Sequence, residues 1–208
     1  MQYKIINDFL SKDLFNYLCS LKLTKVKDSE IINHHNKISK DGSIVISCLD
    51  KENLKKLHLE CHEKAIKLLQ EFSPNKVDLY EYSDFNIIET GKNYSFPIHR
   101  DQVNKLLSGV IYLYPQKNSG TILYDNKFGK NPFQIEWKQN RGFFFSRTEN
   151  TTWHSYQGDG ENNRIVLVYN LMTNNTKKVC ELDKLNYNHI KFREFINPYM
   201  YRFFKKYL

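Results

Sequence analysis

The sequence predicts a mainly β protein of the α+β class, built as two sheets or a barrel with helices on one outer face. Three observations support this prediction. From residue 77, short hydrophobic segments alternate with turn residues at intervals of roughly ten, which is typical of double-sheet and barrel architectures. Helical periodicity dominates before this region and returns after it. Tyr and Phe, with 14 residues each, favour pleated and half-buried surfaces.

The bulk properties limit the choice of class. A chain of 208 residues is long enough for one domain with a sizeable core and too short for two. No apolar stretch approaches the roughly 18 residues that indicate a membrane span, and the N-terminus lacks the apolar core of a signal peptide. We therefore expect a cytoplasmic protein without a membrane partner. The net charge of +8 is spread out, which favours a solvated surface over a nucleic-acid partner.

We expect a single domain over 1–208, in which residues 1–76 form an N-terminal helical support. A strand is predicted over 3–9 and a helix over 12–21, with Ser11 as its N-cap. Residues 22–43 are polar and predict a loop with a short element, in which His34 and His35 are solvated. A long helix over 51–72 follows Asp50 as N-cap. Its apolar face consists of Leu54, Leu57, Cys61, Ala65, Leu68 and Phe72.

Residues 77–172 form the predicted β core, and residues 173–208 a helical extension. The candidate strands are 78–90, 107–114, 120–124, 132–137, 142–146, 151–155 and 164–172. The extension is helical from Leu185, with Pro198 as an expected kink. Its aromatic stripe predicts core packing, with a homodimer contact as the alternative; the stripe consists of Phe192, Phe195, Ile196, Tyr199, Phe203 and Tyr207.

A candidate metal site begins at His99 and Asp101. In extended backbone, side chains two residues apart point to the same face, so one imidazole and one carboxylate can share an ion. His154, on a different predicted strand, is the candidate third ligand. Two imidazoles and one carboxylate leave positions open on the metal, an arrangement that suits non-haem Fe(II).

Arg164 opens the apolar strand over 164–172. A buried cation is costly unless it is paired. A dicarboxylate co-substrate is a suitable partner, because a guanidinium matches a carboxylate bidentately. Pairing with Asp159 or Glu161 across the preceding turn is the alternative. By contrast, His58 and His62 on the long helix are predicted to be ordinary helix residues, because Leu59 stands where a zinc-protease motif needs Glu.

The ordered set of His99, Asp101, His154 and Arg164 resembles the 2-oxoglutarate/Fe(II)-dependent dioxygenase superfamily, nearest in style to the prolyl 4-hydroxylases. That family is marked by H-x-D, a distal His and a following basic residue. Residues 108–114, 119–123 and 140–146 resemble the family's connecting strands, so the resemblance covers about residues 78–172. It implies a double-stranded β-helix (jelly-roll) core, flanked by the helices, with the iron in its mouth.

The resemblance also implies the site chemistry. Fe(II) would bind His99, Asp101 and His154, and 2-oxoglutarate would bind the iron and place its far carboxylate on Arg164. Tyr112 is the expected further contact, and Tyr80 or Tyr82 the expected substitute for a tyrosine that some relatives carry before H-x-D. O2 is the other co-substrate, and the family admits ascorbate. The products would be succinate, CO2 and a hydroxylated substrate.

The substrate stays open at this point. A prolyl or other peptidyl side chain and a small metabolite are both compatible with the resemblance. A nucleic-acid demethylase is a further alternative, for which Arg100, Arg141 and Arg147 are the cations near the mouth. A jelly-roll metal-binding or sensing module without oxygenase activity is the non-enzymatic alternative. A cupin-like hydrolase or isomerase would not need Arg164.

Overall fold

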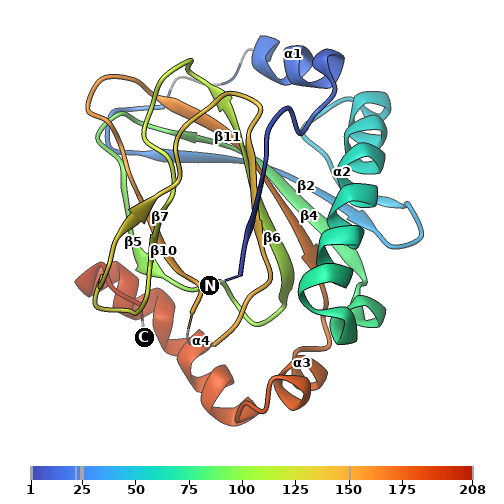
Figure 1. Cartoon of the computed structure of the whole chain (residues 1–208), viewed down its shortest axis with the longest axis vertical. Helices are drawn as coiled ribbons and strands as arrows, with labels where there is room; N and C mark the ends of the chain where they lie inside the picture. Colours follow the sequence, from blue (N-terminus) through green and yellow to red (C-terminus); the bar gives the residue numbers. More distant parts are fainter. Residues whose placement is uncertain (1, 22, 24–25, 150, 208) are drawn as a thin grey trace.

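The computed structural model of the chain describes residues 2–21, 23, 26–149 and 151–207. Two antiparallel sheets form the core, and helices cover the outer face of the larger one (Figure 1). This arrangement confirms the predicted mainly β, jelly-roll class. No helix in the described part of the chain is both long and apolar enough to span a membrane.

The larger sheet has seven strands in the order β1-β9-β6-β11-β4-β2-β3. Their bounds are β1 (Lys4–Ile6), β9 (Gly142–Phe145), β6 (Lys105–Tyr114), β11 (Arg164–Met172), β4 (Tyr82–Thr90), β2 (Ile31–Ser39) and β3 (Ile44–Ile46). The smaller sheet has the order β5-β10-β7-β8. Its strands are β5 (Ser95–His99), β10 (Trp153–Gln157), β7 (Ile122–Tyr124) and β8 (Phe133–Gln134).

The helices are α1 (Lys12–Ser20), α2 (Lys51–Phe72), the 3-10 helix η1 (Pro74–Leu79), α3 (Thr176–Leu182) and α4 (Tyr187–Phe204). The prediction for α2 is confirmed at both ends, and the Asp50 carboxylate accepts a hydrogen bond from the backbone N–H of Asn53. Ser11 precedes α1, but its side chain forms no capping bond. The apolar stripe of α2 packs on the outer face of the larger sheet, where Phe85, Leu167 and Tyr169 are fully buried.

The prediction of a loop over 22–43 is wrong for its second half. Residues Ile31–Ser39 form β2, which pairs with β4 along its whole length. Its polar side chains find partners on β4: His34 Nε2 lies 2.7 Å from Glu89, and His35 Nε2 lies 2.9 Å from Asp84. Neither histidine is therefore simply solvated. Residues 22, 24 and 25 of that predicted loop lie outside the described residues.

The other differences concern short elements. The strand predicted from residue 78 begins at Tyr82, because η1 occupies 74–79. The strand predicted over 132–137 is reduced to β8. Strands β3 and β5 and helix α3 were not predicted. The N-terminal region 1–76 is therefore not purely helical, since it contributes β1, β2 and β3 to the larger sheet.

The aromatic stripe of α4 does not form core. Phe192, Phe195, Tyr199 and Phe203 are between 54% and 69% exposed. The helix instead buries Ile190 against the body of the protein, so its aromatic stripe faces outward. Pro198 lies inside α4, which continues to Phe204. The homodimer contact stays a prediction.

Candidate metal centre

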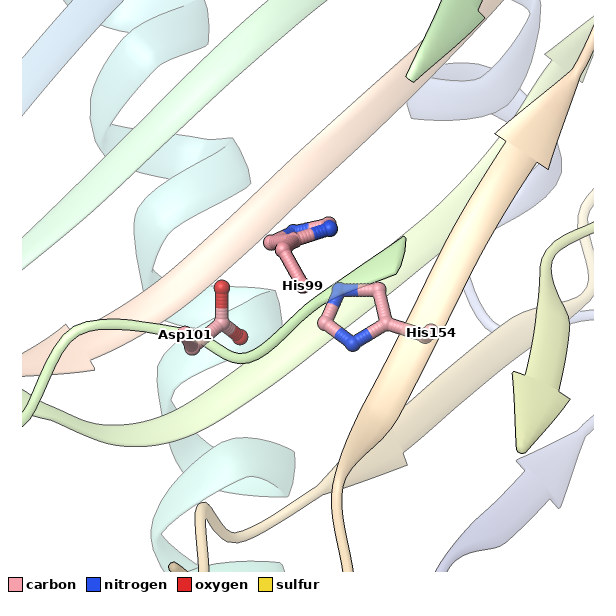
Figure 2. Close-up of side chains that lie close together, drawn as sticks. All are labelled: His99, Asp101 and His154. Atoms are coloured by element: carbon pink, nitrogen blue, oxygen red, sulfur yellow. The ribbon is translucent and has the colours of Figure 1, made fainter. Parts of the chain in front are cut away.

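The three predicted ligands come together at the end of the smaller sheet. His99 at the end of β5 lies directly opposite His154 on β10, and their ring centroids are 4.1 Å apart. Asp101 follows β5 by two residues. One ligand atom from each of the three residues lies within 4.8 Å of the others. Figure 2 shows the three side chains converging on one point. In the described part of the chain, this is the only group of three or more such side chains.

Both imidazoles are oriented by backbone carbonyls. His99 Nδ1 lies 3.0 Å from the carbonyl oxygen of Pro97, and His154 Nδ1 lies 3.0 Å from that of Thr152. In each case the partner is two residues earlier in the chain. Because Nδ1–H donates to a carbonyl, the lone pair remains on Nε2, which is left to bind a metal.

The protonation states suit a cation. Burial, and then the neighbouring imidazole of His154, lower the pKa of His99 to about 3. Burial also lowers the pKa of His154. Burial alone would raise the pKa of Asp101, but Lys105 and the two imidazoles outweigh it and hold that pKa well below its ordinary value. The site therefore presents two neutral imidazoles and one carboxylate.

Asp101 is fixed by two donors. Ser108 Oγ donates to one carboxylate oxygen at 2.5 Å, and Lys105 Nζ donates to the other at 2.8 Å. The side chain is 7% exposed. These contacts hold the carboxylate beside the imidazoles, as the partners of metal ligands commonly do. The donor set fits a divalent metal such as Fe(II).

A cavity of about 220 Å³ extends from the ligands between the two sheets. Its walls are largely apolar and include Ile88, Val110, Phe145, Val166 and Val168. Arg164 lies at one end, opposite Thr90 of β4. The cavity thus joins the three candidate ligands to a single buried guanidinium.

Arg164 is 6% exposed, and its Nε and Nη1 atoms have no hydrogen-bond partner among the described residues. Its guanidinium lies flat against Tyr156, 3.3 Å from the ring centroid. Neither Asp159 nor Glu161 forms an ion pair with it within the described chain. The stacking orients the guanidinium but leaves its donors unmet, as expected of an anion-binding group.

The predicted tyrosines do not line this cavity. The Tyr112 ring stacks on Trp137, and its hydroxyl accepts a 2.9 Å bond from the backbone N–H of Thr121. Thr121 lines the cavity in its place. Tyr82 is at the far end of β4, eight residues from Thr90, beneath the ammonium of Lys37. Tyr80 packs on the other face of the sheet against His62. The structure therefore does not bring Tyr80 or Tyr82 to the site.

Two other tyrosines do reach the cavity, Tyr94 and Tyr156. Tyr156 was predictable, because it stands two residues after His154 on a strand and therefore shares its face. Tyr94 lies just before β5, the strand that the sequence did not reveal. At the mouth, the C-terminal residues turn back, and the Tyr207 ring lies 5.9 Å from those of Phe96 and His99.

The cations predicted near the mouth lie elsewhere. Arg100 stacks on Trp153 and pairs with Glu149, on the opposite side of β5 and β10 from the ligands. Arg147 is 1% exposed and also pairs with Glu149. Arg141 pairs with Glu136. None of the three lines the cavity. His58 and His62 pack with Tyr80, Phe85 and Tyr169 under α2, which agrees with their prediction as ordinary helix residues.

Comparisons with known proteins support the architecture. No protein-family model matches the sequence, and no curated protein matches it. A prolyl-4-hydroxylase from Pseudomonas putida superimposes with a TM-score of 0.55 at 13% identity, over 82% of this chain and 92% of that one. A viral collagen prolyl hydroxylase from Paramecium bursaria Chlorella virus 1, solved with 2-oxoglutarate, gives 0.53 at 14% identity, over 83% and 96%. The dioxygenase for auxin oxidation 1 from Arabidopsis thaliana, also solved with 2-oxoglutarate, gives 0.56 at 16% identity, over 82% and 83%.

The chain therefore has the fold of the 2-oxoglutarate/Fe(II) oxygenases. The solved structures that share it include prolyl hydroxylases, as the motifs had indicated.

Proposed function

We propose that this protein is a 2-oxoglutarate- and Fe(II)-dependent dioxygenase that hydroxylates an unactivated C–H bond. The observation that carries the proposal is the unpartnered guanidinium of Arg164 in the same cavity as His99, Asp101 and His154. A jelly roll that only bound a metal, or a hydrolase, would not need a buried and unpaired cation in the cavity that holds the metal ligands. A dicarboxylate that bound the metal at one end would neutralise it.

His99, Asp101 and His154 would hold Fe(II), and Arg164 would bind the far carboxylate of 2-oxoglutarate. When bound, the iron supplies oxidative decarboxylation of 2-oxoglutarate, so that O2 is divided between succinate and the hydroxylated substrate while CO2 leaves. The apolar walls exclude water from the reacting centre. Ser108 and Lys105 keep Asp101 ionised and in place. The retained carboxylate ligand favours hydroxylation over halogenation.

For the substrate, we propose a peptidyl or prolyl side chain or a small metabolite. Solved structures of this fold include a prolyl hydroxylase bound to a peptide fragment and a dioxygenase for auxin oxidation, so the architecture accommodates both classes.

The decisive experiment is an anaerobic titration of the purified protein with Fe(II) and then with 2-oxoglutarate. We expect a weak visible charge-transfer band when the keto acid binds the iron. His99→Ala should abolish it, whereas His189→Ala, which removes an exposed histidine of α4, should retain it. Bound iron without a band in the wild type would overturn the proposal in favour of the binding-module alternative.

A further inference from the structure

A row of polar side chains crosses the inner face of the larger sheet. Directly paired residues of antiparallel strands point to the same face. Lys37 of β2 pairs with Asp84 of β4, Asp84 with Asn170 of β11, and Asn170 with Ser108 of β6. Ser108 in turn donates to the candidate ligand Asp101. We call these residues, with the neighbouring Asn86, the polar strip. It leads from β2, next to the edge strand β3, to the metal centre.

Two carboxamide oxygens in the strip have no hydrogen-bond partner among the described residues, Oδ1 of Asn86 and Oδ1 of Asn170. The two residues are only 8% and 2% exposed, and Asn170 lines the cavity. Asn86 Nδ2 donates to Asp84 at 3.1 Å, which sets the orientation of that carboxamide. The residue paired with Asn170 on β6 is Ser108, whose hydroxyl donates to Asp101, and the neighbouring pair of Val168 and Val110 offers no donors. Buried acceptors of this kind are normally satisfied, so they indicate a ligand that brings donors.

The charges around the strip favour a cationic donor. Asp84 accepts from His35 and Asn86, and it forms no ion pair with a lysine or arginine within the described chain. Lys37 lies over the Tyr82 ring, 3.8 Å from its centroid, and Lys105 is paired with Asp101. The Asp84 side chain is 24% exposed, so the strip is open to solvent at this point.

We infer that the polar strip binds a primary ammonium group of the substrate, so that the substrate is an amino acid or another amine. An ammonium has three donors and no acceptor, and it meets here the oxygens of Asn86, Asn170 and Asp84. A hydroxyl would bring one donor, and a carboxylate none. One part of the inference rests on the proposed function, namely that the bound amine is the compound that is oxidised. Because Asn170 stands beside Ser108, the ammonium would lie next to the metal centre.

The test uses three probes of equal chain length, n-butylammonium, n-butanol and butyrate. Each is titrated into the full chain without iron or 2-oxoglutarate, and the side-chain carboxamide signals are followed by NMR. We expect n-butylammonium to shift the Asn86 and Asn170 signals, whereas butanol should leave them unchanged and butyrate should bind at Arg164 instead. Asn170→Leu and Asn86→Leu should each weaken its binding about tenfold or more, the effect of losing one bond to a charged group.

Two further variants keep the result interpretable. Asn33→Leu removes an exposed carboxamide on the same face of β2 and should bind n-butylammonium as the wild type does. Asn170→Asp keeps the acceptor and should retain binding, which separates a lost contact from a lost fold. Asn86 and Asn170 signals that butanol or butyrate shifts as strongly as n-butylammonium does, no binding of n-butylammonium, or unchanged binding by both leucine variants would each overturn the inference. The amine titration uses protein without iron. A missing charge-transfer band in the separate Fe(II) titration would therefore refute the proposed oxygenase activity and leave the amine result unchanged.

Discussion

Two buried arginines of this protein differ in whether their charge is paired within the described chain. Arg147 is 1% exposed, and it donates to the backbone oxygen of Asp101 and pairs with Glu149. Arg164 is also buried, but its nearest group is the ring of Tyr156 and two of its nitrogen atoms are unpartnered. A buried charge without a counter-charge lowers stability. Arg164 therefore lowers the stability of the ligand-free protein in a way that an anionic ligand would reverse.

This contrast predicts opposite effects of the same substitution. Arg164→Met should raise the free energy of unfolding of the ligand-free protein by about 1–4 kcal/mol, because an apolar side chain of similar length replaces an unpaired charge. Arg147→Met should lower it by about 1–3 kcal/mol, because the buried carbonyl oxygen of Asp101 loses its donor. Chemical denaturation measures both. Mn(II) alone should stabilise both proteins, and adding 2-oxoglutarate to the Mn(II)-loaded protein should stabilise the wild type further and Arg164→Met much less. A destabilised Arg164→Met protein would contradict the binding role of this residue.

The C-terminal helix is tied to the segment that carries the distal ligand. Arg193 of α4 donates to Glu149 at 2.6 Å, and Arg100 reaches the same carboxylate at 2.7 Å. Burial alone would raise the pKa of Glu149, but Arg193, Arg147 and Arg100 outweigh it and lower that pKa. Glu149 lies five residues before His154. One carboxylate thus links α4, the end of β5 and the approach to β10.

Neutralising this carboxylate should release α4 without unfolding the sheets. Glu149→Gln removes the carboxylate that Arg100, Arg147 and Arg193 share. We expect amide hydrogen exchange in Tyr187–Phe204 to accelerate about tenfold or more, the effect of weakening a bond to a charged group. Exchange in α2 should stay unchanged, because Lys51–Phe72 does not contact Glu149 in the described structure. Unchanged exchange in α4, measured by mass spectrometry, would show that Ile190 and the mouth aromatics hold the helix without Glu149.

The layer between α2 and the larger sheet makes the fold sensitive to acid. His58 is buried there, with Nδ1 3.1 Å from the hydroxyl of Tyr169. Burial, and then the neighbouring His62, lower its pKa to about 4. An unfolded chain has a histidine pKa of about 6.5. Between these values the unfolded state binds more protons, so stability falls as the pH drops from about 6.5 towards 4.

His58→Leu should therefore flatten the dependence of unfolding free energy on pH in this window, measured by denaturation at a series of pH values. His189→Leu, on the exposed face of α4, should leave it as in the wild type. A residual slope is expected from His62, His99 and His154, whose pKa values burial also lowers. An unaltered slope in His58→Leu would mean that this imidazole is not held neutral by the fold.

Local signals account for the elements that were predicted well. Helix α2 has a capping aspartate and an apolar residue every three or four positions, so its ends and its buried face follow from neighbouring residues. Strands β6 and β11 are continuous apolar segments between turns. Strand β2 was missed because its residues are polar and are stabilised by partners on β4, and β5 because Pro97 interrupts its pattern.

The candidate site could be predicted from the sequence, since His99 and Asp101 are two positions apart and Arg164 opens an apolar strand. The strand patterns likewise predicted the mainly β class. The remaining features depend on which strands lie side by side. The register of β10 places His154 opposite His99, the stacking of Tyr156 on Arg164 joins two strands, and the polar strip crosses four. The outward face of α4 depends on how that helix docks. Cross-strand register and helix docking join residues far apart in the chain, and no local periodicity encodes them.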